Sequence, residues 1–277
     1  MLEIRKAESY GFCFGVKRAI KIAEELKDAT TIGPLIHNNE EINRLKRDFN
    51  VKTVEGFDEL GEVKKAIIRT HGIEKQNLEK LKKSDIEIVD ATCPYVTNPQ
   101  KIVEKMSKDG YQIVVFGDEK HPEVKGVRSY SVTPPIVIAN VEELENHTIK
   151  NKVAIVAQTT KKISEYQKVV DYLTSITREV RVFNTICNAT FENQDAVRKL
   201  SQEADVMIII GGKNSSNTKE LYKISKENCN DSYHIENESE LEKKWFENKN
   251  LCGISAGAST PDWIIEKVIS KIKEICV

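Results

Sequence analysis

Three cysteines of this chain occupy the same kind of position, between a strand-like run and a helix-like run. In EIVDATCPYVT the β-branched run ends before Cys93, and a proline typical of a first helical turn follows it. Cys13 precedes apolar residues at helical spacing, and Cys187 stands between a strand-like run and a polar helix. A thiol at a helix start meets unpaired N–H groups and the positive end of the helix dipole, which favour its thiolate. We therefore expect three units, each presenting one reactive or metal-binding cysteine.

Strand-like and helix-like segments alternate along the whole chain, which predicts an α/β architecture with mostly parallel sheets. The cysteine positions divide it into three similar units, residues 1–92, 93–186 and 187–277. In such sheets ligands gather beyond the carboxyl ends of the strands. Polar candidate site residues follow the predicted strands: His37, His71, His121, Glu123, Thr159, Ser215, Ser216, Asn217 and Ser259.

Composition excludes several classes of protein. The 277 residues carry 42 basic and 43 acidic side chains, a formal net charge of −1, so no overall basic field attracts nucleic acid. No apolar run approaches the roughly 20 residues that cross a bilayer, and the first residues lack the apolar core of a signal peptide. We expect a cytoplasmic protein without membrane or nucleic-acid partners. Six cysteines are too sparse for a disulfide scaffold.

The three cysteines are open to two interpretations. Taken singly, each is more often a buried thiol, because cysteine packs well in protein cores. Their shared setting favours a common metal centre, in which three thiolates leave one coordination position open. A cubane iron–sulfur cluster held in this way has one iron available to a substrate oxygen. Cys229, Cys252 and Cys276 lack the setting and are assigned to core or surface.

The sequence His121-Pro122-Glu123 resembles half of the zinc deaminase signature. The partner motif P-C-x-x-C is missing downstream, so a deaminase is rejected. Glu123 remains a candidate proton donor, because a carboxyl beside a histidine can protonate a leaving hydroxyl. The alternative is a solvated acid in a polar loop.

Two loops, residues 213–218 and 253–260, combine glycines, hydroxyls and an amide with predicted helix starts. Such loops bind anions, including a diphosphate, although Ser and Asn also serve there as ordinary helix caps. Neither loop has a mononucleotide or dinucleotide motif. His37 and His71 are candidates to neutralise phosphate oxygens.

A series of motifs along nearly the whole chain resembles the 4-hydroxy-3-methylbut-2-enyl diphosphate reductase family. In order they are GFCFGVKRAI, GPLIHN, RTHG, DATCPYVT, HPEVKG, AQTT, TIC-x-AT, KNSSN and SAGASTPDW. Nine motifs in series are far more specific than any one of them. The chain departs from the family at Phe14, Lys120 and Asn188.

The resemblance implies a trefoil of three α/β units around one [4Fe–4S] cluster per chain, held by Cys13, Cys93 and Cys187. It implies reductive dehydroxylation of the allylic diphosphate to isopentenyl and dimethylallyl diphosphates, the last step of the methylerythritol phosphate route. Glu123 would relay protons with Thr159. The substrate would be bound by His37, His71, His121, Thr159, Ser215, Ser216, Asn217 and Ser259. Reduced ferredoxin or flavodoxin would supply electrons, and the protein would be a monomer.

Two rival functions stay open on the residues alone. A zinc hydrolase would use the same cysteines and Glu123, would be colourless and would need no reductant. A redox sensor would carry an iron–sulfur centre without turning over a diphosphate, and it would leave the histidines and the Ser-Ser-Asn loop without a use.

Overall fold

The computed structural model describes residues 2–61 and 63–276, and within them the strands form three four-stranded sheets with parallel pairings throughout. The strands are β1 (Glu3–Lys6), β2 (Thr30–Ile32), β3 (Lys52–Val54), β4 (Lys65–Ile68), β5 (Glu87–Asp90), β6 (Gln112–Phe116), β7 (Ile136–Ile138), β8 (Lys152–Ala157), β9 (Glu179–Phe183), β10 (Val206–Ile210), β11 (Ser232–Ile235) and β12 (Leu251–Ala256). The predicted α/β class with three parallel sheets is confirmed.

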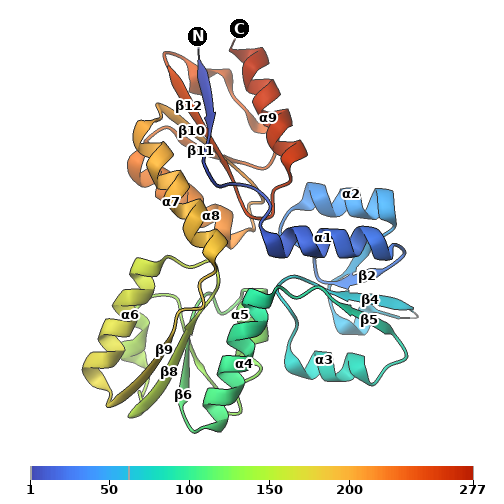
Figure 1. The fold of residues 1–277 in the computed structure, drawn as a ribbon, viewed down its shortest axis with the longest axis vertical. Coiled ribbons are helices and arrows are strands. Elements are labelled where there is room, and N and C mark those ends of the chain that lie inside the picture. Colours follow the sequence, from blue (N-terminus) through green and yellow to red (C-terminus); the bar gives the residue numbers. More distant parts are fainter. Residues whose placement is uncertain (1, 62, 277) are drawn as a thin grey trace. The chain divides into compact units, whose positions relative to one another are not determined.

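Helices connect the strands in alternation (Figure 1). The α-helices are α1 (Phe14–Leu26), α2 (Asn39–Phe49), α3 (Lys75–Lys82), α4 (Pro94–Lys108), α5 (Pro122–Arg128), α6 (Ile163–Ile176), α7 (Asn188–Glu203), α8 (Ser216–Asn228) and α9 (Asp262–Ile275). Short 3-10 helices are η1 (Phe57–Glu59), η2 (Glu142–Asn146), η3 (Glu238–Glu240) and η4 (Lys243–Phe246).

The chain folds into two compact units, which are described separately. Unit 1 comprises Met1–Lys17, Ile36–Arg44 and Asn188–Val277, and unit 2 comprises Arg18–Leu35 and Leu45–Cys187. Unit 1 contains one sheet, in the order β1-β12-β10-β11, and unit 2 contains the other two, β3-β2-β4-β5 and β7-β6-β8-β9.

The sheet of unit 1 is covered on both faces, which explains the unbroken apolar run of β10. Ile208 and Ile210 pack in one buried cluster with Ile265 and Val268 of α9. Met207 and Ile209 pack in a second cluster with residues of α7 and α8, including Val197 and Leu221. Figure 1 shows α9 on one side of this sheet and α7 and α8 on the other. A strand buried on both faces needs apolar residues at every position.

The three sheets share one strand order, although one of them is completed by the start of the chain. In unit 2 each sheet is built from four consecutive strands, and the last of the four is the edge strand, β5 or β9. In unit 1 the corresponding edge is β1, which pairs with β12 from Glu3↔Leu251 to Lys6↔Ile254. Residues 3–6, placed by the sequence in the unit 1–92, thus belong to the sheet of residues 206–256. The division into three units stays a prediction, with residues 3–6 moved from the first unit to the third.

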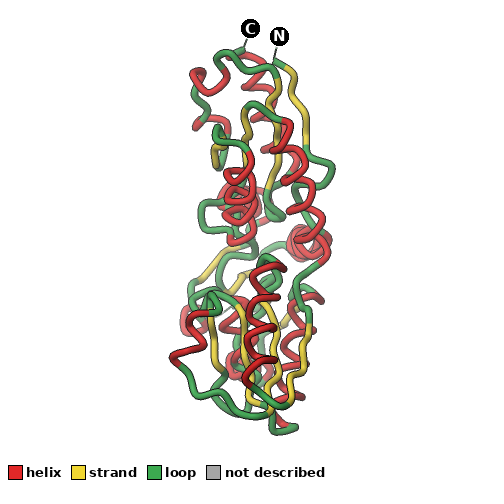
Figure 2. Tube along the Cα trace, turned by 90° about the vertical axis from the view of Figure 1, so that its left-hand side faces the viewer, coloured by secondary structure: helices red, strands yellow, loops and turns green. Residues whose placement is uncertain are grey.

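In unit 2 the two sheets also have apolar clusters against helices. Ile68 and Leu81 lie in the cluster beside β4 and α3, and Val103 and Val115 lie in the cluster beside α4 and β6. Figure 2 shows helical and extended segments running alongside one another through the lower part of the chain trace. Each sheet of this unit is therefore stabilised by its own buried core.

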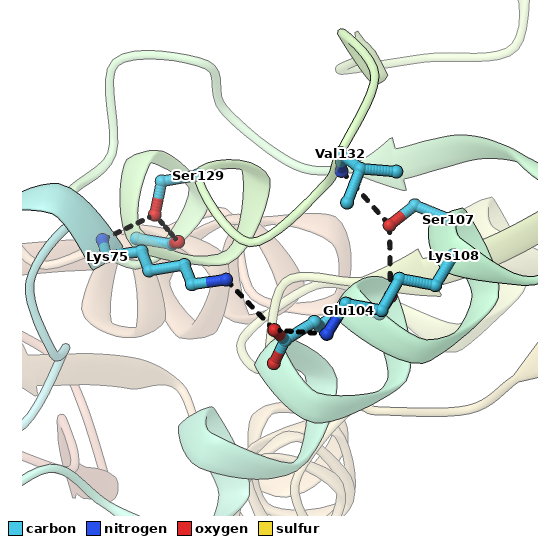
Figure 3. Close-up of polar contacts among 7 residues, drawn as sticks. Lys75, Glu104, Ser107, Lys108, Ser129 and Val132 are labelled. Carbon is cyan, nitrogen blue, oxygen red and sulfur yellow. Dashed lines mark hydrogen bonds and ion pairs between the residues drawn. The ribbon is translucent and has the colours of Figure 1, made fainter.

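A polar network ties α3 of the first sheet to α4 and α5 of the second (Figure 3). Glu104 accepts hydrogen bonds from the ammonium groups of Lys108 and Lys75, each at 2.9 Å, and these lower its pKa to about 2. Ser129 accepts from the N–H of Lys75 at 2.9 Å. The network holds the loop before α3, which carries His71, next to α5.

Among the helices of the described chain, none combines the length and the apolar character that crossing a membrane requires. The predicted cytoplasmic location and monomeric state stay predictions.

Gly253 is predicted to be essential for packing in unit 1. A Cβ at this position would lie 2.2 Å from Met207 Sδ and 2.9 Å from Leu200 Cγ. Gly253→Ala should therefore reduce the free energy of unfolding by about 1–3 kcal/mol, the usual cost of overpacking, measured by urea unfolding. Gly56→Ala is the matched control, because a Cβ at that position would meet nothing within 4 Å. Equal stability of the two variants would contradict this packing.

Candidate functional site

The predicted site residues follow specific strands of the three sheets. In each sheet the two inner strands are adjacent in space but not consecutive in the chain: β2 and β4, β6 and β8, β10 and β12. Helices therefore leave these strands in opposite directions, and the crevice beyond their carboxyl ends is where such sheets bind ligands. Predicted site residues follow both inner strands of each sheet: His37 follows β2 and His71 follows β4, Glu123 follows β6 and Thr159 follows β8, Asn217 follows β10 and Ser259 follows β12.

Each of the three predicted cysteines follows an edge strand and directly precedes a helix, α1, α4 or α7. Its backbone N–H donates to a carbonyl two residues beyond the neighbouring inner strand. Cys13 donates to Ala258 at 3.2 Å, Cys93 to Thr70 at 3.0 Å, and Cys187 to Thr159 at 3.0 Å. The accepting residue is either a predicted site residue itself, Thr159, or the neighbour of one, His71 or Ser259.

The local setting of these thiols suits metal ligation. All three cysteines are half-buried, and none of them forms a disulfide. Cys93 has extended backbone angles, φ −64° and ψ 134°, as the residue that caps α4, with Pro94 in the first turn. By contrast, Cys229 and Cys252 are buried in apolar clusters. Burial raises the pKa of Cys252 to about 12, which keeps it a neutral thiol.

Glu123 is a buried carboxyl rather than a solvated loop acid. The polar loop that was the alternative setting for Glu123 ends at His121, which caps α5, and the helix begins at Pro122. Glu123 is 1% exposed. Its Oε1 accepts from the N–H of Thr159 and its Oε2 from the Thr159 hydroxyl, both at 2.7 Å. Desolvation raises the pKa of Glu123 to about 6 despite these two hydrogen bonds, which lower it.

His121 and His71 are neighbours in unit 2. Their rings meet edge to face, with centroids 5.4 Å apart. Nδ1 of His121 accepts from the N–H of Glu123 at 3.2 Å, so this nitrogen carries no proton and the neutral ring carries it on Nε2. Thr70 donates its hydroxyl to the carbonyl of Leu35 at 2.9 Å, which fixes the strand end before His71.

Close packing shapes the backbone around Gln158 and Thr159. A Cβ on Gly117 would lie 2.6 Å from Val124 Cγ2 and 3.1 Å from the side chain of Gln158. Gln158 accepts from the N–H of Asp118 at 3.0 Å. The hydroxyl of Thr185 donates to the carbonyl of Ala157 at 2.6 Å and lies 2.8 Å from the Ala157 N–H, which donates to it. These contacts fix where Thr159 lies relative to α5.

In unit 1 the two loops predicted to bind an anion, residues 213–218 and 253–260, pack against each other. Thr218 is fully buried in the first turn of α8, and a Cβ on Gly257 would lie 2.0 Å from its Oγ1. A Cβ on Gly211, which has φ +152°, would lie 2.6 Å from the same atom. The glycines thus allow loops 211–218 and 257–260 to pack through one threonine. Ser215 caps α8 by accepting from the N–H of Thr218 at 3.2 Å.

Asn217 is the feature of this loop that most indicates a ligand. It is 5% exposed, and neither its amide oxygen nor its amide nitrogen has a hydrogen-bond partner within the described chain. A buried amide without partners costs free energy, so it is expected where a bound molecule completes the hydrogen bonds.

The segment that carries His37 is held firmly within unit 1. Ser259 donates its hydroxyl to the His37 carbonyl at 3.1 Å, and a Cβ on Gly212 would lie 2.5 Å from that oxygen. Four residues on, the buried carboxylate of Glu41 accepts from the indole N–H of Trp263 at 2.9 Å. It also accepts from Arg44 at 2.6 Å.

The predicted site residues therefore fall into two sets. Unit 1 holds Cys13, His37, Ser215, Ser216, Asn217 and Ser259, and unit 2 holds His71, Cys93, His121, Glu123, Thr159 and Cys187.

Supporting residues that the sequence reasoning missed include Thr70, Thr185, Thr218 and Glu41. Thr70 and Thr185 stand within the motifs RTHG and TIC-x-AT, and Thr218 ends the loop 213–218. Their position beside a predicted site residue was the signal that could have found them.

Comparison with known proteins decides the family. The profile of the family described as LytB protein matches residues 4–273. The chain belongs to the LytB family. Over 276 residues and the full length of both chains, it is 66% identical to a 4-hydroxy-3-methylbut-2-enyl diphosphate reductase of a Nitratiruptor species. The prediction that it is a reductase of this family is confirmed.

Solved structures of the family agree with the fold. One is described as (E)-4-hydroxy-3-methyl-but-2-enyl diphosphate reductase, the terminal enzyme of the non-mevalonate pathway. It is 46% identical, with a TM-score of 0.72 over 99% of this chain and 100% of that one. Another is E-1-hydroxy-2-methyl-but-2-enyl-4-diphosphate reductase from Plasmodium falciparum. It is 26% identical, with a TM-score of 0.90 over 96% of this chain and 86% of that one.

The buried carboxyl of Glu123 should give stability a specific pH dependence. Its pKa is about 6 in the folded chain, against an ordinary value of 4.5. Between these values the folded chain binds more protons than the unfolded chain, so the contribution of Glu123 to the free energy of unfolding falls as pH rises and levels off above about pH 7. The total loss is about 2 kcal/mol.

Glu123→Gln removes this titration and keeps the amide and hydroxyl of Thr159 within hydrogen-bonding reach. The free energy of unfolding of the variant, relative to that of the unsubstituted chain, should rise by about 2 kcal/mol between pH 4.5 and pH 7. Urea unfolding of both chains across this range, in the same metal-free state, measures the difference. Glu145→Gln, at an exposed position, controls for loss of a carboxylate. A pH-independent difference for Glu123→Gln would show that Glu123 is not the buried titrating group.

Proposed function

We propose that this chain reduces 4-hydroxy-3-methylbut-2-enyl diphosphate to isopentenyl and dimethylallyl diphosphates, with loss of the hydroxyl as water. The reaction consumes two electrons and two protons. The proposal extends to this chain the activity for which its full-length relatives are named, and it would place the chain at the end of the non-mevalonate route to isoprenoids.

One observation carries the proposal: Thr159 connects a buried carboxyl to a cysteine. Its N–H and hydroxyl both donate to Glu123, and its carbonyl accepts from the N–H of Cys187. A proton donor and a predicted metal ligand are thus joined through a single residue. Reductive dehydroxylation needs this combination, because electrons and a proton must reach the same carbon–oxygen bond.

The chemistry of the donor set fits a [4Fe–4S] cluster, one per chain, which Cys13, Cys93 and Cys187 would hold. Each thiol is half-buried at the start of a helix, and cysteine sulfurs are the usual ligands of iron–sulfur clusters. Three thiolates in equivalent settings leave one coordination position without a protein ligand. Such a cluster, when bound, supplies electrons and Lewis acidity.

The remaining residues bind and orient the substrate. Asn217, with its unsatisfied buried amide, would bind the diphosphate together with Ser215, Ser216 and Ser259 at the start of α8 and the neighbouring loop. His37 and His71 would add hydrogen bonds and positive charge, and His121, whose Nδ1 accepts from the N–H of Glu123, would donate a hydrogen bond from Nε2. Binding energy from the diphosphate would then orient the reacting carbon–oxygen bond.

Glu123 would deliver the proton. With a pKa of about 6, it holds a proton in an appreciable fraction of molecules near neutral pH, which an ordinary glutamate does not. When protonated, its hydroxyl can donate to Thr159 Oγ1, 2.7 Å away. The hydroxyl of Thr159 would then donate its own proton to the substrate hydroxyl or to a water.

The first test is the content of iron, zinc and acid-labile sulfide after anaerobic purification. About four irons and matching sulfide per chain are expected for a cubane cluster, and Cys93→Ser should lose most of the iron. Cys229→Ser is the matched control, because Cys229 is buried in an apolar core. Stoichiometric zinc without sulfide would favour the hydrolase instead. A fully iron-loaded, active Cys93→Ser would remove Cys93 from the ligand set.

Glu123→Gln tests the proton donor. Because Glu123 does not hold the cluster in this proposal, the variant should retain iron and colour. It should lose turnover of the allylic diphosphate by about 10²–10⁴-fold, the usual contribution of general acid catalysis. Turnover is measured anaerobically with an excess of a chemical reductant. An unchanged rate at full iron content would exclude Glu123 from the mechanism and leave the reductase assignment intact, whereas iron without turnover in the unsubstituted chain would favour the sensor.

A further inference from the structure

Lys213 stands in the loop of residues 211–218, but its ammonium group is bound to a different segment of unit 1. A lysine in an anion-binding loop commonly contacts phosphate oxygens itself. Here Nζ donates to the carbonyl of His234 and lies 3.0 Å from Oε2 of Glu240. These partners belong to β11 and η3, which follow the loop by about twenty residues. The lysine therefore ties the loop to that segment.

The backbone at the start of the loop is held by the same segment. Strand β11 lies beside β10, from which the loop leaves. The N–H of Gly211 donates to the carbonyl of Ile235 at 2.8 Å, and the carbonyl of Gly211 accepts from Nε2 of His234, also at 2.8 Å. The N–H of Lys213 donates to Oε1 of Glu236 at 2.7 Å. Three backbone groups of the turn after β10 are thus fixed from one side.

The groups that hold the loop are themselves held. Glu240 binds Lys213 with one carboxylate oxygen, and its other oxygen accepts from the N–H of Glu236 at 2.5 Å. The ring of His234 lies against that of Tyr222 of α8, with centroids 5.9 Å apart. Burial lowers the pKa of His234, so near neutral pH the ring is uncharged, and Nε2, which faces a carbonyl, carries its proton.

The loop needs such support because of Asn217, four residues after Lys213. Its buried amide has no hydrogen-bond partner within the described chain. A loop that rearranged to give this amide partners would gain free energy, so the observed arrangement persists only when both ends of the loop are fixed. The far end is fixed by the Ser215 cap and by the packing of Thr218. The contacts of Gly211 and Lys213 fix the near end.

Charge alone does not explain the two acids beside this loop. Hydrogen bonds from the N–H of Glu236 and from Lys213 outweigh the effect of burial and lower the pKa of Glu240, so it is ionised at neutral pH. A carboxylate repels an anion bound nearby. Removal of such a carboxylate would therefore strengthen anion binding if charge were its only role, and would weaken anion binding if it holds the loop.

Resting on the proposed function, we propose a set of positioning residues that hold Asn217 ready for the diphosphate: Lys213, His234, Glu236 and Glu240. None of the four touches the substrate. Their contribution is made before the substrate arrives, because a loop that is already arranged loses less conformational freedom when it binds. The lysine of the KNSSN motif is thereby assigned to the loop's own structure and not to the phosphate oxygens.

The test uses Glu236→Ala in the iron-loaded chain, with inorganic pyrophosphate as the probe. Loss of the bond to the Lys213 N–H should raise the Kd for pyrophosphate about tenfold, measured by calorimetry. Glu236→Gln should stay within about threefold, because its amide oxygen can accept from the same N–H. For the allylic diphosphate, Glu236→Ala should raise KM about tenfold and change kcat less than about threefold, since bound diphosphate restores the loop through Asn217.

Hydrogen exchange gives a second readout that needs neither turnover nor a ligand. In Glu236→Ala the amides of residues 213–218 should exchange about tenfold faster, while those of residues 206–210 in β10 keep their rate, which shows that the sheet is folded. His234→Phe, which keeps a ring beside Tyr222 and loses the Nε2 hydrogen bond, should act in the same direction. Glu242→Ala is the matched control, because this exposed acid pairs with Lys244 at 2.6 Å.

Unchanged or tighter pyrophosphate binding by Glu236→Ala would overturn the proposal, and so would equal exchange rates in residues 213–218. An equal effect of Glu242→Ala would reduce the result to a general loss of charge and would also overturn it. If the unsubstituted iron-loaded chain does not turn over the allylic diphosphate, the proposed function fails, and pyrophosphate affinity and exchange still decide the positioning role. If it does not bind pyrophosphate, the positioning proposal is overturned.

Discussion

The hydrogen bond from the backbone N–H of each predicted ligand cysteine to the adjacent inner-strand loop is the constraint on which the site depends. It recurs in all three sheets, with acceptors in Ala258, Thr70 and Thr159. Because the acceptor is a backbone carbonyl, the bond fixes the position of the cysteine without using a side chain. The side chains at or next to the acceptor take no part in this bond: those of Ser259 and Thr159 donate to His37 and Glu123 instead. One backbone interaction thus brings a sulfur donor and a polar group together.

Burial gives the polar groups of this site their chemical character. Glu123 has two hydrogen-bond donors directed at it, which alone would make it a stronger acid, yet its pKa rises because water is excluded. Asn217 is in a similar position, because its amide is removed from water without receiving partners from the described chain. Such groups are costly in the free protein, and they become favourable when a ligand supplies the missing interactions. Stability is thereby exchanged for binding.

The sequence predicted the architecture well because both relevant patterns are local. Apolar runs such as MIII in β10 and the strand–Cys–helix transition around Cys93 are read within a dozen residues. It also predicted the residues that follow the inner strands. Pairing between distant segments was not available from local patterns, so the sequence did not reveal that residues 3–6 belong to the sheet of residues 206–256. The burial of Glu123 was missed for a similar reason, because its cover comes from Thr159, 36 residues away.

The pairing of β1 with β12 has a consequence for how the chain is made. The first strand leaves the ribosome long before its partner exists, since Glu3 pairs with Leu251. The two sheets of unit 2 have all their strands within residues 30–183 and are complete in the chain much earlier. Residues 3–6 must wait with an unpaired edge until residues 251–254 have been made. The sheet that carries the Ser-Ser-Asn loop is therefore the last of the three to close, because it needs residues 3–6 and 251–254 together.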